Sequence, residues 1–153
     1  MRSQFLILVL AALCACRPSA PQLETERPAL EFVAMPGGLD LPFSGLVRVG
    51  SMLYLSGQLG TDSATRLVPG GIGPETAQAL ENVRALLEGH GSGMDRVVKC
   101  TVMLADITEW PAMNREYARH FPGRPPARSA FGTSGLALGA RVEIECLAVA
   151  GAP

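Results

Sequence analysis

The sequence predicts an α+β domain in which two helices cover one face of a mixed β-sheet. Two observations carry this prediction. Apolar strand-like runs are separated by two helical apolar stripes, and the elements follow in the order hairpin, helix, strand, helix, strand, strand. Hydrophobic residues make up 48% of the 153 residues, which is enough for one domain with its own core.

The hairpin is expected within LVRVGSMLYLSGQ, residues 46–58, because Gly50 suits the first position of a type II′ turn. The first helix is expected from Pro74, which fits its first position, to Gly89 or Gly91. Thr108 is the expected cap of a second helix that carries Pro111 in its first turn. The remaining strands are expected at residues 95–106, 128–131 and 141–150, the first of them parallel to an earlier strand through the helical crossover.

The central strands are apolar at every position, as in residues 52–55 and 102–104. Neither face of such strands looks solvated, and two helices cover only one face. We therefore expect a homo-oligomer that buries the other face.

The first residues, MRSQFLILVLAALCAC, have the pattern of an export signal. Arg2 precedes an apolar stretch, Phe5 to Leu13, that is too short to span a membrane. The end of the stretch matches a bacterial lipobox at Cys16, so we expect residues 1–15 to be a lipoprotein signal peptide and Cys16 to be acylated. The protein would then be lipid-anchored in the cell envelope on the periplasmic side. The alternatives are a plain cleaved signal that yields a soluble periplasmic protein, and an ordinary apolar N-terminal helix.

Residues 16–30 are rich in Pro and charge and predict a tether, so the domain is expected to span residues 31–153. Only Cys100 and Cys146 remain in that domain. Both lie in apolar runs where buried free thiols are the common case, and a disulfide is the alternative in an oxidising compartment.

The charge balance argues against a positively charged surface that could bind nucleic acid. Thirteen Lys and Arg stand against fourteen Asp and Glu, and no basic run concentrates the cations. The sequence has no phosphate-binding glycine motif, no His pair at metal-ligand spacing and no elbow for a nucleophile. We therefore predict no metal, no cofactor and no nucleic-acid partner.

A small polar set lies within the apolar elements. Its members are Ser56, Asn114, Arg128, Glu143 and Glu145. Glutamates two apart point the same way from a strand, and burying an unpaired charge is costly. These charges therefore form either a salt bridge between subunits, with Arg128 as the cation, or a cleft at the subunit interface.

Four segments carry a family resemblance: LPFSGLVRVGSMLYLSGQLG, NVRALLEGHGSGMDRVVKCTVMLADITEW, MNREYARHFPGRPPARSAF and VEIECLAVA. In order and spacing they resemble the RidA (YjgF/YER057c) family of enamine and imine deaminases. The resemblance covers Leu41 to Ala150, and its most specific element is the pairing of Pro-Ala-Arg-Ser with an Ile-Glu strand.

The resemblance implies a chorismate-mutase-like fold assembled as a homotrimer, with clefts between subunits. It implies hydrolysis of 2-imino or enamine acids to 2-keto acids and ammonia, with no cofactor. Arg128 would hold the substrate carboxylate and Glu143 would position or activate water. Ser56 and Asn114 would line the cleft, and Gly57 would let the backbone approach the ligand.

The chain also departs from the family pattern. Phe43 stands where a tyrosine is frequent, which keeps the ring and removes the hydroxyl, and Ala130 stands where a cysteine is frequent and would act through its backbone carbonyl. Two other functions stay open, the first favoured by Phe43 and the leader and the second implied by the resemblance, since some members of the family are proposed to act in that way. One is a module that binds small carboxylates without turnover, and the other is a chaperone-like trimer.

Overall fold

The computed structural model describes residues 28–35 and 41–151. The predicted signal peptide, Cys16 and most of the predicted tether lie outside the described residues. The helices are α1 (Ile72–Gly89) and α2 (Trp110–His120), with short 3-10 turns η1 (Met94–Arg96), η2 (Ile107–Glu109) and η3 (Ala137–Gly139). The strands are β1 (Leu30–Val33), β2 (Leu46–Val49), β3 (Met52–Leu55), β4 (Gln58–Leu59), β5 (Val97–Leu104), β6 (Ala127–Gly132) and β7 (Val142–Val149).

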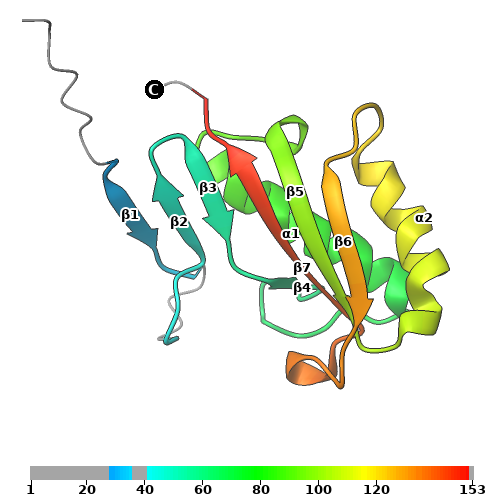
Figure 1. Ribbon diagram of the computed structural model, residues 1–153. Helices are drawn as coiled ribbons and strands as arrows, with labels where there is room; N and C mark the ends of the chain where they lie inside the picture. The colour runs from blue at the N-terminus through cyan, green and yellow to red at the C-terminus, as the bar shows by residue number, and fades with distance from the viewer. Residues whose placement is uncertain (1–27, 36–40, 152–153) are drawn as a thin grey trace, which may run out of the picture.

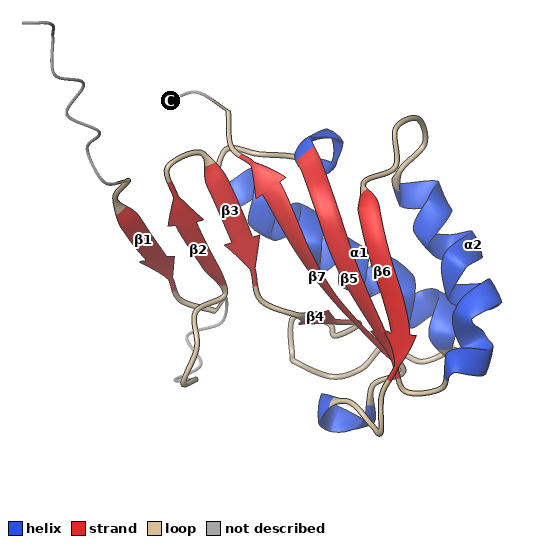
Figure 2. Cartoon of the chain, in the orientation of Figure 1, coloured by secondary structure: helices blue, strands red, loops and turns tan. Residues whose placement is uncertain are grey.

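All the described strands belong to one mixed sheet, with the order β1-β2-β3-β7-β5-β6 and with β4 paired to β7. Among the described strands only β5 and β6 pair in parallel. Both α-helices lie on the same face of this sheet, as Figures 1 and 2 show. The predicted α+β architecture, with two helices on one face, is confirmed.

The predicted hairpin is β2 and β3, which pair antiparallel. Its turn residues are Gly50 and Ser51, and only Gly50 has a positive φ, 58°, as a type II′ turn requires. The hairpin is not the first element, because β1 precedes it and pairs with β2. That strand begins at Leu30, one residue before the predicted start of the domain.

The strand β5 runs in the same direction as β3, as predicted, but the two are not neighbours. The last strand, β7, lies between them and is antiparallel to both. The parallel hydrogen-bonded partner of β5 is instead the later strand β6. The predicted parallel direction is therefore confirmed, and the structure adds that β7 lies between the two strands.

Both helices begin in a different way from that predicted. The helix α1 starts two residues before Pro74. The helix α2 follows directly on the 3-10 turn η2. The N-cap of η2 is Asp106, whose carboxylate accepts a hydrogen bond from the Thr108 backbone N–H at 2.9 Å. Thr108 is the partner of the cap and not the cap itself. Neither described helix is long and apolar enough to cross a membrane.

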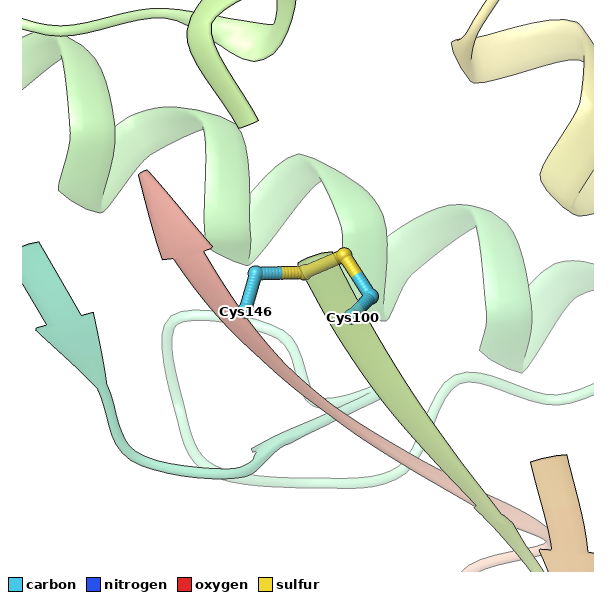
Figure 3. Close-up of a disulfide and its surroundings, with 2 residues drawn as sticks. All are labelled: Cys100 and Cys146. Carbon is cyan, nitrogen blue, oxygen red and sulfur yellow. A yellow bond between two sulfur atoms is a disulfide. The ribbon is translucent and has the colours of Figure 1, made fainter. Parts of the chain in front are cut away.

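Cys100 and Cys146 form a disulfide, which corrects the expectation of free thiols. They are directly opposite each other on β5 and β7, with their Cα atoms 4.1 Å apart, and both are buried in the core (Figure 3). Directly opposed residues on neighbouring antiparallel strands are close enough for a disulfide to form between them. The sequence could not show this, because the register of two strands 46 residues apart decides it.

The face of the sheet that the helices leave open carries apolar side chains. Leu30, Phe32, Tyr54 and Phe131 are 60%, 67%, 44% and 47% exposed. On β3, β5 and β7 the alternate residues are buried, because the helices pack against one face of these strands. Single exposed apolar residues are ordinary, whereas a row of them along a sheet is typical of a contact surface. Burial of this face in a homotrimer stays a prediction.

Candidate functional site

Arg128 extends from β6 toward α2 and is held there by uncharged groups. Its Nη2 donates to Asn114 Oδ1 at 2.6 Å. The guanidinium carbon lies 4.5 Å from the centre of the Tyr117 ring and 5.6 Å from that of Trp110, both within cation–π range. None of the ion pairs formed among the described residues includes Arg128. The positive charge is therefore positioned without being neutralised.

Tyr117 is the buried member of this group. Its ring packs against Phe121, with ring centres 4.8 Å apart and planes tilted by 38°. Its hydroxyl is buried and has no hydrogen-bond partner among the described residues. Burial raises the pKa of Tyr117 to about 12, and the nearby Arg128 opposes that rise. The phenol thus stays neutral at ordinary pH.

Glu143 lies on the open face of the sheet, the opposite side from Arg128. Residues alternate along β7, with Ile144 and Cys146 buried and with Glu143 and Glu145 on the other side, as the sequence predicted. Partial burial raises the pKa of Glu143, and the like charge of Glu145 raises it further. This carboxyl therefore binds a proton more tightly than an ordinary glutamate does.

Gly57 allows the close approach of Glu143. A Cβ atom at position 57 would lie 2.7 Å from the carboxyl carbon of Glu143 and closer still to one of its oxygens. Ser56, the preceding residue, donates its hydroxyl to the Ser44 carbonyl at 2.6 Å and so holds the loop that carries Phe43. The ring of Phe43 is 53% exposed.

The predicted site residues, together with Tyr117, thus fall into two groups. We call Asn114, Tyr117, Arg128 and Ala130 the Arg128 half, and Phe43, Ser56, Gly57 and Glu143 the Glu143 half. Arg128 is level with Cys146 across β5, and Glu143 lies three residues further along β7. The two backbones are therefore separated by about 10 Å across the sheet and about 10 Å along it. Since the two side chains also leave opposite faces, one chain does not bring them together.

Two features of this region were missed from the sequence. Trp110 and Tyr117 fit an apolar stripe, and the spacing of three residues between Asn114 and Tyr117 is the one signal that they share a surface. The open face also has a hollow of about 280 Å³, lined in part by Tyr54, Lys99 and Glu145. No cluster of potential metal ligands is present in the part of the chain that the structure describes.

Comparison with known proteins identifies the family. A family model described as Endoribonuclease L-PSP matches residues 39–150. The chain belongs to this family, the RidA (YjgF) family. The resemblance read from the four sequence segments is confirmed.

RidA relatives cover most of this chain. A goat protein named 2-iminobutanoate/2-iminopropanoate deaminase is 46% identical over 111 residues, which is 72% of this chain and 81% of the relative. The human protein of the same name is 41% identical over 117 residues, covering 76% and 85%. A yeast structure, YEO7, has a TM-score of 0.76 at 32% identity and covers 80% of this chain and 100% of its own. The YjgF gene product of E. coli has a TM-score of 0.72 at 29% identity, with coverage of 78% and 98%.

Proposed function

We propose that this protein hydrolyses 2-imino acids and enamines, of the 2-iminobutanoate and 2-iminopropanoate type, to 2-keto acids and ammonia. The names of its relatives support deamination of imines in general. The observation that carries the proposal for this chain is the Arg128 guanidinium, which is fixed by an amide and two aromatic rings and has no carboxylate partner within the described residues. Such a cation suits a small carboxylate ligand.

The substrate carboxylate would bind the N–H groups that Arg128 does not give to Asn114. A planar guanidinium makes two parallel hydrogen bonds to a carboxylate, which fix both its charge and its plane. The C=N carbon next to the carboxylate then has a defined position. The Ala130 carbonyl, two residues along β6, is the proposed further contact.

Glu143 would act on the water. Water adds to the carbon of the protonated imine while Glu143 takes one of its protons, which gives a tetrahedral amino alcohol. Proton transfer to the amine and collapse of this intermediate break the C–N bond, release ammonia and leave the keto acid. No electron is transferred at any step, so the chemistry requires no redox cofactor. The protonated imine is already electrophilic, so the site needs only to orient it and to supply water. A raised pKa makes Glu143 a better base once it is ionised.

The site would be completed between subunits. Because one chain separates Arg128 from Glu143, we propose a homotrimer in which the Arg128 half of one subunit faces the Glu143 half of the next. The apolar open face supports such an assembly. Light scattering of the purified protein is the direct check, and a monomer at micromolar concentration would contradict it.

The activity test uses imines generated in situ by an amino acid oxidase. Purified protein is expected to release ammonia faster than buffer alone does, and Arg128→Ala is expected to abolish the difference. Loss of a bidentate charged contact costs about 2 to 5 kcal/mol. Arg128→Lys keeps the positive charge but loses the planar group that makes two parallel hydrogen bonds, and it is expected to retain only a part of the wild-type activity. Equal rates for wild type and buffer would refute the proposal.

A subunit-mixing experiment tests the shared site separately. Arg128→Ala and Glu143→Gln are each expected to be inactive, and trimers that contain both variants are expected to regain activity. Random mixing in equal amounts gives an intact Arg128 facing an intact Glu143 in about a quarter of the clefts. If both residues act within one chain, mixing restores nothing.

The exposed ring of Phe43, without a hydroxyl, favours one other function. The protein would then bind a small carboxylate through Arg128 and not turn it over. A thermal-shift screen with keto acids, run beside the ammonia assay, separates the two, because binding without turnover indicates a receptor.

The family description names an endoribonuclease, and a formal net charge of -1 argues against that activity here. Proteins that hold RNA phosphates need clustered cations. The absence of a nucleic-acid partner stays a prediction, which a gel-shift assay with single-stranded RNA checks.

We also propose that the protein is exported and lipid-anchored at Cys16, with residues 1–15 removed. The Cys100–Cys146 disulfide supports an oxidising location, since disulfides are rare in reducing cytosol.

A further inference from the structure

We propose that Tyr117 is a positioning residue for Arg128. Its ring face and the Asn114 amide hold the guanidinium in an orientation that leaves the other N–H groups free for a ligand carboxylate. This inference rests on the proposed function for the identity of the substrate. Its primary measurement is carboxylate binding, which does not depend on turnover.

The contacts on Arg128 restrain it from two directions. Asn114 Oδ1 accepts a hydrogen bond from Nη2 of Arg128 at 2.6 Å. The guanidinium carbon lies over the Tyr117 ring, 4.5 Å from the ring centre. Among the described residues the Arg128 side chain makes no hydrogen bond other than the one to Asn114. An arginine has five N–H donors in a fixed fork, so these two contacts leave a free edge.

The Tyr117 ring is itself packed in the core. Tyr117 is 4% exposed, and Phe121 packs on its ring. A ring that is packed in the core restricts where the guanidinium stacked on it can lie. Trp110, which is 38% exposed and 5.6 Å from the same carbon, adds a second and looser ring.

The ring of Tyr117, and not its hydroxyl, carries this role. The hydroxyl has no partner within the described residues, so its removal breaks no hydrogen bond there. Asn114 and Tyr117 are also uncharged, which matters because a carboxylate in either place would hydrogen-bond to the guanidinium and neutralise its charge. A cation–π contact holds a guanidinium while leaving its hydrogen-bonding edge open.

The experiment compares Tyr117→Leu with Tyr117→Phe, and uses Met113→Leu as a control at a buried position on the same helix. Binding of 2-oxobutanoate is measured by calorimetry, and KM and kcat are measured with imines generated in situ. Tyr117→Leu is expected to raise both Kd and KM about tenfold, with kcat changed by less than about twofold. Tyr117→Phe is expected to rescue this loss, because it restores the ring.

A purely structural role predicts a different result. In that case Tyr117→Leu lowers Tm and leaves Kd unchanged, as Met113→Leu does, and the inference is overturned. Equal losses in the Phe and Leu variants would also overturn it, because they would place the effect in the hydroxyl. If Tyr117→Leu does not fold, Tyr117→Met replaces it, because this longer flexible side chain fills more of the buried space without supplying a ring, and the same rise in Kd is expected. An unchanged Kd there overturns the inference.

The outcomes also separate this inference from the proposed function. If the wild type binds the keto acid but hydrolyses no imine, the deaminase proposal fails while the Kd series still decides the role of Tyr117. If hydrolysis is present and Tyr117→Leu behaves as wild type, only the positioning role fails. If the wild type binds no carboxylate, both fail.

Discussion

Reduction of the Cys100–Cys146 disulfide is expected to lower the free energy of unfolding substantially. The bond joins β5 to β7 and closes a loop defined by a sequence separation of 46 residues. In the chain-entropy account, opening a loop of this length costs about 4 kcal/mol at 25 °C, because the unfolded chain regains the conformations that the crosslink excluded. A domain of ordinary stability has only about 5 to 15 kcal/mol in total.

Urea unfolding measures this loss. Because the disulfide is buried, the protein is first unfolded and then refolded with or without a thiol reductant at one fixed protein concentration. For a slope of about 2 kcal/mol per molar, the loss moves the urea midpoint down by about 2 M. Cys100→Ala/Cys146→Ala is the control, since its midpoint cannot respond to the reductant. Equal wild-type midpoints after a thiol assay has confirmed full reduction would refute the reasoning.

Two further predictions concern the Glu143 half. Because folding raises the pKa of Glu143, the folded state disfavours its ionised form and loses stability as pH rises through that pKa. Glu143→Gln is therefore expected to raise Tm by about 2 °C at neutral pH, a gain that shrinks as the pH falls and that calorimetry across pH checks. Gly57→Ala is expected to push the Glu143 carboxylate aside and lower kcat about a hundredfold, with Tm nearly unchanged because only a flexible side chain must move. A kcat equal to that of wild type would show that this close approach has no catalytic role.

Local sequence patterns were sufficient for the helices and for most strands. Alternating and helical apolar periods depend on neighbours a few residues away, so β5, β7 and α2 follow directly from them. The strand β1 was missed because it is mostly exposed and forms a strand only by pairing with β2. The boundary errors at Pro74 and Thr108 are errors of one turn or less, where a preceding residue provides the start of the helix.

Relationships between distant segments could not be predicted from single segments. The insertion of β7 between β3 and β5 places Cys146 opposite Cys100, and no pattern within either strand specifies that register. The same holds for the site. Sequence patterns supplied Arg128, Asn114 and Glu143 as polar residues in apolar elements, whereas their separation into two halves depends on the sheet order.

The presence of the disulfide links the stability of the domain to the predicted export signal. A buried crosslink that adds about 4 kcal/mol is available only where thiols oxidise, so the stability of the domain would depend on export. Cys16→Ser is expected to abolish incorporation of labelled fatty acid and to release the protein from the membrane fraction. It should leave the Cys100–Cys146 bond intact, because the variant is still exported to the oxidising compartment. Labelled acyl chains on the Cys16→Ser protein would contradict lipidation at Cys16, and free thiols in the wild-type protein purified from the envelope would contradict the link between export and the disulfide.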